Sequence, residues 1–132
     1  MKLITRDTDY ALRALSFIAQ NKDRIVAVSE LTRKLRVPQP FLRKILQVLS
    51  RRRILSSLKG QGGGFILAKD PARIFIADIM RIFQGELKLN ECFLKKLACP
   101  HKKACVLRKK ITRIENYVLR ELNSITIKSL LQ

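Results

Sequence analysis

Three cysteines, Cys92, Cys99 and Cys105, lie close together in a chain of 132 residues that contains no other cysteine. The segment around them is rich in Lys and Arg. Positive charge favours the thiolate form of cysteine, and thiolates bind both zinc and iron–sulfur clusters. The three cysteines are therefore candidate ligands of a metal site.

His101 lies between the second and third cysteines, and three Cys with one His is a common donor set of structural zinc sites. Uncoordinated thiols that sense oxidation directly are another interpretation. An odd number of clustered thiols in a reducing compartment favours metal or redox chemistry over a disulfide framework. From the residues alone, zinc and an iron–sulfur cluster are equally well supported.

The formal net charge is +18, and a charge of this size attracts a polyanion. Nucleic acid is favoured over an anionic membrane surface, because the chain has no Trp for the apolar face of a surface-binding helix. No uncharged apolar run approaches the ~18 residues of a membrane span. Charged residues also interrupt the N-terminal segment too early for a signal peptide, so we expect a cytoplasmic protein.

The first half of the chain has the pattern of a helix-turn-helix. Apolar residues at helical spacing predict a helix over 9–21. A second helix is expected to start at Ser29, with this residue as N-cap, and to end near Arg36, because Pro38 disfavours helical conformation at the residue before it. The next helix opens at Gln39, with proline tolerated in its first turn.

This third predicted helix has an apolar stripe at positions 42, 45, 46 and 49. In a helix-turn-helix the second of the two helices enters the major groove, where Arg, Lys and Gln can reach base edges or phosphates. The candidate reading residues point away from the stripe: they are Arg43, Lys44, Gln47 and Arg51. From Arg33 to Lys59 there are nine Lys or Arg and no Asp or Glu, which argues against a merely solvated face.

A β-hairpin is expected next, with strands at 54–58 and 65–67 on either side of the glycine-rich segment 59–64. Its glycines allow the backbone to approach another molecule closely. Lys59 and Gln61 are candidates for minor-groove or phosphate contacts, and Arg33 is a further DNA-binding candidate. The predicted fold is mainly α with a small β-hairpin, a winged helix-turn-helix followed by a long C-terminal helix.

The rest of the chain is predicted as a helix over 76–84 that ends at Gly85, a cysteine-bearing loop, and a long amphipathic helix from about 104 to 122. The apolar stripe of this last helix needs a cover, and both a second copy in a twofold dimer and its own domain would serve. We expect three parts: a DNA-binding domain (1–85), a cluster loop (86–104), and a dimerisation helix with a C-terminal tail (105–132).

Four segments carry a resemblance that spans nearly the whole chain: 2–15, the helix-turn-helix, the hairpin with its GQGGGF string, and the cysteine segment 92–110. They resemble the bacterial winged-helix regulators typified by IscR, NsrR and the iron regulator RirA, and the pattern is most similar to NsrR. The resemblance implies a homodimer that binds partly palindromic double-stranded DNA operators. It also implies an iron–sulfur cluster held by Cys92, Cys99 and Cys105 and one further ligand.

For the fourth ligand, the resemblance to NsrR-like members implies Asp9, supplied by the partner subunit, because it lies in a T-D-x-A-L-R context. His101 is the alternative and Asp7 a third candidate, while Asp9 could instead be only a helix N-cap. IscR-like members have His three residues after the third cysteine, where this chain has Arg108. The gap between the first two cysteines is also one residue longer than the family pattern.

We therefore expect a homodimeric DNA-binding transcription regulator, a repressor, controlled by an iron–sulfur cluster that senses nitric oxide, iron or redox state. A four-iron four-sulfur cluster is favoured, and a two-iron two-sulfur cluster is compatible. The alternative is a zinc-stabilised or thiol-based nucleic-acid-binding protein without a cluster. An enzyme is not expected, since the chain has one His, no nucleophile–base pair and no phosphate-binding fingerprint.

Overall fold

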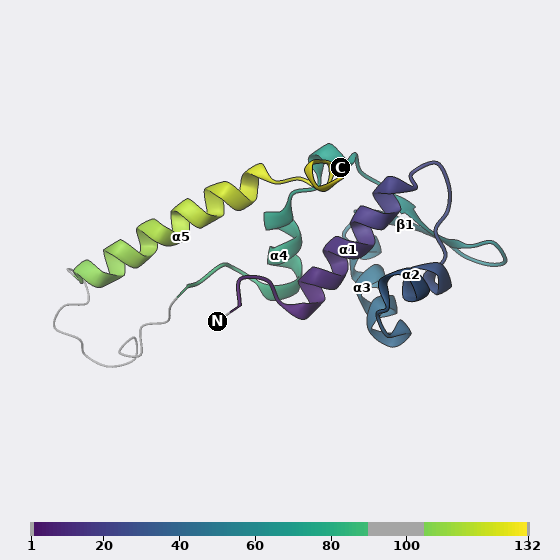
Figure 1. Ribbon diagram of the computed structural model, residues 1–132, viewed down its shortest axis with the longest axis horizontal. Coiled ribbons are helices and arrows are strands. Elements are labelled where there is room, and N and C mark those ends of the chain that lie inside the picture. The colour runs from purple at the N-terminus through teal and green to yellow at the C-terminus, as the bar shows by residue number, and fades with distance from the viewer. Residues whose placement is uncertain (1, 90–104, 132) are drawn as a thin grey trace.

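The computed structural model describes residues 2–89 and 105–131. Figure 1 shows a domain of short helices with a β-hairpin, and a long helix, α5, that extends away from it. The elements are α1 (Arg6–Gln20), α2 (Val28–Leu35), α3 (Gln39–Arg51), β1 (Leu55–Leu58), β2 (Gly64–Leu67), the 3-10 helix η1 (Pro71–Arg73), α4 (Ile76–Gln84), α5 (Val106–Ser124) and the 3-10 helix η2 (Lys128–Leu130).

Helix α1 begins three residues earlier than its apolar pattern predicts. Thr5 is the N-cap, and its hydroxyl accepts a hydrogen bond from the backbone N–H of Thr8. Asp9 therefore lies in the first turn of the helix, and the interpretation of Asp9 as the cap is wrong. The negative charge is still favourable there, because the N-terminal end of a helix carries partial positive charge.

The helix-turn-helix is formed by α2 and α3. The prediction that Ser29 caps α2 is wrong: Ala27 occupies the cap without a side-chain hydrogen bond. Val26 is held extended by a two-way backbone pairing with Phe65, so the chain turns into the helix directly after it. The end of α2 lies where it was expected, with Arg36 in a left-handed conformation, and α3 starts at Gln39.

The wing is the antiparallel hairpin of β1 and β2, in which Leu55 pairs with Leu67 and Leu58 pairs with Gly64. Val26 adds one bridge on the other side of β2, at Phe65. This bridge explains why residue 64 is a glycine, since a Cβ atom there would collide with the backbone carbonyl of Val26. The wing is thus attached to the chain that enters the helix-turn-helix.

The core forms around α1, which packs against α3, α4 and strand β2. Leu15, Ile18, Leu42, Leu46 and Ile79 are fully buried in it. Burying each of these side chains contributes about 1.5–3 kcal/mol relative to leaving it exposed. The stripe predicted for α3 is therefore its core-facing side, and the opposite side of α3 is left for solvent.

The C-terminal segment after α5 returns to the core. Thr126 forms a bridge with Phe75, and the backbone N–H of Ile127 donates to the carbonyl of Ile74 at 2.9 Å. Ile127 is fully buried. The beginning of α4 is therefore held by residues from the far end of the chain.

The amphipathic stripe of α5 is only partly covered. Leu122 is buried against the domain and Val118 is partly buried, whereas Leu107 and Ile114 are 66% and 51% exposed. Figure 1 shows that the beginning of α5 lies far from the rest of the domain. Within the described ranges, no helix combines the length and the hydropathy needed to cross a lipid bilayer.

Candidate nucleic-acid interface and metal ligands

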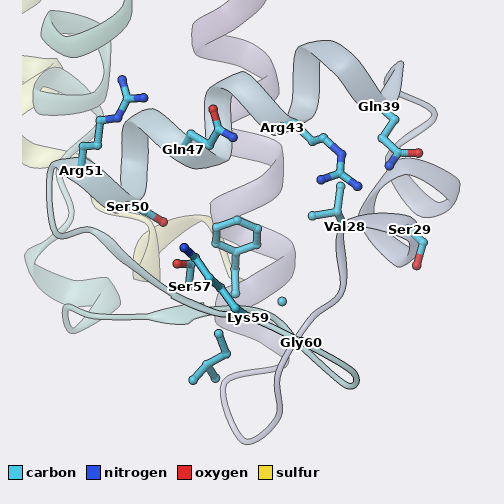
Figure 2. Close-up of a pocket in the computed structure, with 14 residues that line it drawn as sticks. Val28, Ser29, Gln39, Arg43, Gln47, Ser50, Arg51, Ser57, Lys59 and Gly60 are labelled. Atoms are coloured by element: carbon cyan, nitrogen blue, oxygen red, sulfur yellow. The ribbon is translucent and has the colours of Figure 1, made fainter.

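An open groove of about 680 Å³ lies between α3 and the wing, with the beginning of α2 at one end. Figure 2 shows α3 along one side of the groove and the hairpin with Ser57 and Lys59 along the other. The predicted DNA-binding residues among its lining are Arg43, Gln47, Arg51 and Lys59. The fold thus brings side chains from α3, the recognition helix of the helix-turn-helix, and from the wing to one surface.

This groove carries positive charge on both sides. Its lining includes the cations Arg43, Arg51 and Lys59, and it includes no Asp or Glu. Cationic side chains that line a concave surface attract the phosphates of nucleic acid and release their counterions. The polar groups of Gln47 and Ser57 add hydrogen-bonding capacity next to these charges. The arrangement suits contacts with both the phosphate backbone and the base edges of a DNA duplex.

Three other candidates from the sequence lie outside the groove lining. Lys44 is exposed on α3, Arg33 is exposed on α2, and Gln61 is exposed at the tip of the hairpin. The side-chain period of a helix separates Lys44 from its neighbour Arg43 by about a quarter turn. These three residues remain free to contact phosphates that flank the groove.

The sequence interpretation missed four polar residues that line the groove: Ser29, Gln39, Ser50 and Ser57. Gln39 is the most informative of them, because its amide lies against the guanidinium of Arg43. The spacing of four residues on one helix could have indicated this pair. The hydroxyl of Ser50 is buried and has no hydrogen-bond partner in the described structure.

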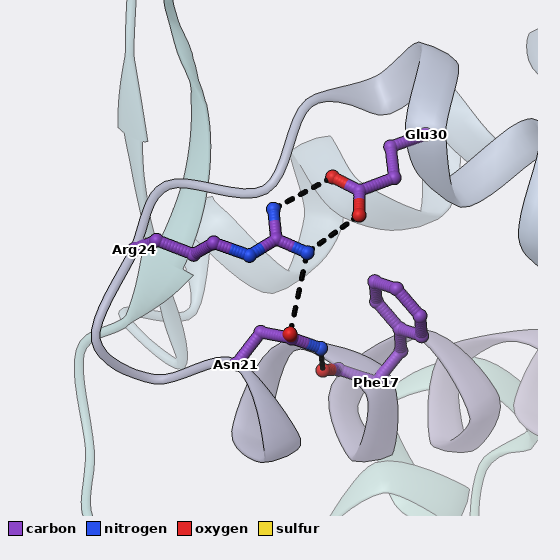
Figure 3. A network of polar contacts seen from close by, with 4 residues as sticks. All are labelled: Phe17, Asn21, Arg24 and Glu30. Atoms are coloured by element: carbon purple, nitrogen blue, oxygen red, sulfur yellow. Dashed lines mark hydrogen bonds and ion pairs between the residues drawn. The ribbon is translucent and has the colours of Figure 1, made fainter.

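The loop between α1 and α2 is held by a polar network around Arg24 (Figure 3). Its guanidinium donates to both carboxylate oxygens of Glu30, with 2.8 Å from Nη1 to Oε2, and to Asn21 Oδ1 at 3.2 Å. The hydrogen bonds from Arg24 hold the pKa of Glu30 below its usual range; the charges of Arg24, Arg33 and Lys34 act in the same direction, and desolvation opposes them. The network fixes the entry to the helix-turn-helix.

The first turn of α1 joins two other helices. Thr8 is fully buried, and its hydroxyl donates to Gln84 Oε1 at the end of α4, at 2.7 Å. The guanidinium of Arg6 lies over the ring of Phe41 on α3, 4.8 Å from its centroid, within range of a cation–π interaction. The first turn of α1 therefore contacts both α3 and the end of α4.

Of the candidate metal ligands, the structure describes Cys105, Asp9 and Asp7. Cys105 is half-buried at the N-cap of α5, where its sulfur accepts from the backbone N–H of Arg108 at 3.5 Å. Asp9 forms an ion pair with Arg13 at 2.9 Å, and its side chain is 45% exposed. Asp7 is paired with Arg6 at 3.7 Å.

The predicted ligands Cys92, Cys99 and His101 lie outside the described residues. Within 2–89 and 105–131 there is no group of three His, Cys, Asp or Glu side chains that could hold a metal ion. Figure 1 shows that α5 begins well away from the first turn of α1 in the same chain. Cys105 and Asp9 of one chain are therefore separated in space.

Comparisons with known proteins agree with this architecture. The family described as "Rrf2: Iron-dependent Transcriptional regulator" matches residues 4–132. A protein of Aquifex aeolicus, described as an HTH-type transcriptional regulator, is 37% identical over 92% of this chain and 86% of its own length. The HTH-type transcriptional regulator NsrR of Shouchella clausii is 30% identical over 96% of this chain and 87% of its own length.

Among solved structures, CymR, the global cysteine regulator of B. subtilis, superposes with a TM-score of 0.82. It is 22% identical, and the match covers 98% of this chain and 96% of that chain. This likeness supports the winged helix-turn-helix fold. The two sequence relatives are regulators and not enzymes, as expected here. Since the family match spans nearly the whole chain, we conclude that this protein is a transcriptional regulator of the Rrf2 family.

Proposed function

We propose that this Rrf2-family regulator acts as a homodimer that binds a partly palindromic DNA operator, with an affinity controlled by an iron–sulfur cluster. The observation that carries the DNA-binding part is the acid-free groove between α3 and the wing, with Arg43 and Arg51 on one side and Lys59 on the other. In a winged helix-turn-helix this surface faces the duplex. Arg33, Lys44 and Gln61 are assigned to flanking contacts.

The cluster assignment is supported by chemistry and by the family, which is described as iron-dependent. Thiolates of Cys92, Cys99 and Cys105 suit an iron–sulfur cluster, with a four-iron four-sulfur type favoured over a two-iron two-sulfur type. The position of Cys105 supports its role, because its half-buried sulfur lies at the start of α5, directly after the part of the sequence that carries Cys92 and Cys99.

Asp9 of the partner subunit is our choice for the fourth ligand, with His101 as the alternative. Because Cys105 and Asp9 of one chain lie apart, a site that contains both requires a second copy. A carboxylate is a weak and exchangeable ligand for such a cluster, which suits a sensor. To serve as a ligand, Asp9 must give up its ion pair with Arg13, which is exposed and therefore worth little.

The uncovered face of α5 supports the dimer. Val106, Leu107, Ile114 and Tyr117 are more than half exposed on one helix, whereas single exposed apolar residues are the norm elsewhere on protein surfaces. Pairing α5 with its copy would cover this face in both chains at once. The two recognition helices would then sit about one DNA turn, ~34 Å, or a multiple of it apart.

The first turn of α1 offers a route from the cluster to DNA. It carries Asp9 and contacts α3 through Arg6 and Phe41, and α4 through Thr8 and Gln84. Gain or loss of the cluster would shift the positions of the two recognition helices. Such coupling commonly amounts to about 1–3 kcal/mol, or a 5- to 150-fold change in affinity.

The test is anaerobic purification followed by absorption spectroscopy and DNA binding. A brown protein supports the cluster, whereas a colourless protein with bound zinc, or with no metal, identifies the zinc-stabilised or thiol-based alternative.

Cys99→Ala should abolish the chromophore and change operator affinity, Asp9→Ala should leave a labile or altered cluster, and His101→Ala should leave it intact. If His101→Ala bleaches the protein and Asp9→Ala does not, the fourth ligand is His101; if cluster removal leaves DNA affinity unchanged, the sensor mechanism is wrong.

A further inference from the structure

We propose that Gln39 is a positioning residue that presents Arg43 to a guanine in the major groove, so that the Gln39–Arg43 pair determines one base of each half-site. This inference rests on the proposed DNA-binding role of α3 and goes further by assigning a base. Gln39 is the first residue of α3, and Arg43 lies one turn later on the same side of the helix. Both residues line the groove (Figure 2).

The geometry of the pair is specific. In the orientation drawn in Figure 2 the amide nitrogen of Gln39 faces the guanidinium, which sets donor against donor. Half a turn of the amide brings its oxygen to this place, where it accepts hydrogen bonds from Arg43 Nε at 3.1 Å and from Arg43 Nη2 at 2.8 Å. A single oxygen atom thus accepts both hydrogen bonds from one side of the guanidinium, the side that carries Nε and Nη2. An exposed arginine otherwise samples many rotamers, so this contact reduces the orientations that Arg43 adopts before DNA arrives.

A count of the donors shows what remains for DNA. A guanidinium has five N–H groups in a planar fork, one on Nε and two on each Nη nitrogen. With its oxygen toward Arg43, the Gln39 amide takes the Nε hydrogen and one Nη2 hydrogen. The end of the fork, with one N–H from each Nη nitrogen, stays free and forms a bidentate donor pair.

Guanine is the base that matches this donor pair, since its major-groove edge presents two acceptors, N7 and O6. Adenine presents one acceptor and one donor there, and its donor would face an N–H of the arginine. No Asp or Glu belongs to the groove lining, so no carboxylate of the groove competes for the free end of Arg43. The groove therefore selects for guanine at the position that Arg43 reaches.

The experiment uses the whole chain and a pool of 30-base-pair duplexes with a randomised centre. Selection with the wild type should yield sites with guanine preferred at one position of each half-site by about 5- to 150-fold. Gln39→Met keeps the length of the side chain but lacks an acceptor, and it should lower that preference by about two- to twelvefold, the cost of ordering a free arginine. Arg43→Met should remove the preference.

Three further variants separate positioning from other effects. Gln39→Glu keeps an acceptor next to the guanidinium, so it should retain the guanine preference while its negative charge weakens binding to all sequences. The double variant Gln39→Met with Arg43→Met should show no loss of preference beyond that of Arg43→Met alone. Gln20→Met, a matched change at an exposed site on α1, should behave as wild type.

The proposal is overturned if Gln39→Met selects the same sites as the wild type with the same preference. It is also overturned if Arg43→Met weakens all sequences equally and flattens the salt dependence, because Arg43 is then a phosphate contact. Failure of the proposed function has a different signature: the wild type itself would enrich no sequence from the pool.

Discussion

At the scale of single residues, Thr8 shows how a buried polar group connects helices. Its hydroxyl donates to Gln84 Oε1, which also accepts from the backbone N–H of Thr5, while Gln84 Nε2 donates to the carbonyl of Leu3. Buried polar groups are costly unless they are hydrogen-bonded, so these hydrogen bonds stabilise one arrangement of the N-terminal turn against α4.

Replacing Thr8 by Val keeps the shape of the side chain and removes the hydroxyl. We expect Thr8→Val to lower the free energy of unfolding by about 0.5–1.5 kcal/mol for each of the two hydrogen bonds that its hydroxyl forms, with Gln84 Oε1 and with Thr5 Oγ1. Urea denaturation followed by circular dichroism measures this change. Thr32→Val is the matched control: its hydroxyl donates only to the carbonyl of Val28 within α2, so the substitution should change stability less. Equal effects of the two variants would contradict the stabilising role of the hydrogen bonds around Thr8 and Gln84.

Glu30 gives a prediction of pH dependence. The hydrogen bonds from Arg24 lower its pKa in the folded state, with help from the charges of Arg24, Arg33 and Lys34. A carboxyl group whose pKa is depressed on folding contributes stability above its unfolded pKa, near 4.3, and loses this contribution as the pH falls through the folded value. Wild type should therefore be more stable than Glu30→Gln at neutral pH, and the difference should disappear in acid.

Denaturant unfolding of wild type and Glu30→Gln between pH 7 and pH 3 checks this expectation. Asp23→Asn, one residue from Arg24, is the matched control because Asp23 forms no ion pair with a residue that the structure describes. A stability difference for Glu30→Gln that stays constant with pH would show that the network acts through shape and not through charge.

At the scale of elements, the C-terminal segment stabilises α4 from outside the winged helix. The carbonyl of Ile125 accepts from the backbone N–H of Ile76 at 3.0 Å, and Ile127 is fully buried beside Ile74. Helix α4 has no side-chain cap of its own, so this returning segment supplies the acceptor that its first residue needs.

We expect Ile127→Ala to destabilise the protein by about 2–5 kcal/mol, because it removes a fully buried side chain and leaves a cavity. Leu130→Ala, three residues later at a side chain that is 44% exposed, should change the free energy of unfolding by less than about 0.5 kcal/mol. Urea unfolding of both variants makes the comparison. Similar small effects would show that the tail does not contribute to the core in solution.

At the scale of the whole molecule, the exposed face of α5 predicts the oligomeric state. Leu107 and Ile114 lie seven residues apart on one side of the helix, and Thr112 lies on the opposite side. In a twofold dimer each substitution occurs twice, so Leu107→Glu or Ile114→Glu places two charges in an apolar interface.

Wild type and Thr112→Glu should therefore be dimers at micromolar concentration, and the other two variants should be monomers. Light scattering coupled to gel filtration measures the mass directly. A stable wild-type monomer would contradict the α5 dimer, as would variants that remain dimeric.

The net charge of +18 predicts DNA binding that weakens strongly with salt. Each phosphate contact contributes about 0.9 to the slope of log affinity against log salt concentration, so Lys59→Gln should reduce the slope by about that amount. Lys128→Gln changes the net charge equally at an exposed site in η2, which is not part of the groove. Titrations between 50 and 200 mM salt, about the range in which such contacts are usually compared, test this. Equal slopes for the two variants would show that Lys59 does not contact a phosphate.

The sequence by itself determined the local elements and the family. The apolar stripe of α3 and the stops at Pro38 and Gly85 are local signals, because helical period, proline and glycine act within a few residues. The hairpin and α4 were likewise predicted to within one or two residues, since turn residues bound them on both sides.

Only the tertiary structure decided which of these residues act together. Ser29 is not the cap of α2 because Val26 pairs with Phe65, nearly forty residues away along the chain. The burial of Ile127 and the split of α5 into covered and uncovered parts depend on contacts between distant segments. Arg43 and Arg51 share a groove with Lys59 because the position of the wing relative to α3 is set by such contacts and not by spacing in the sequence.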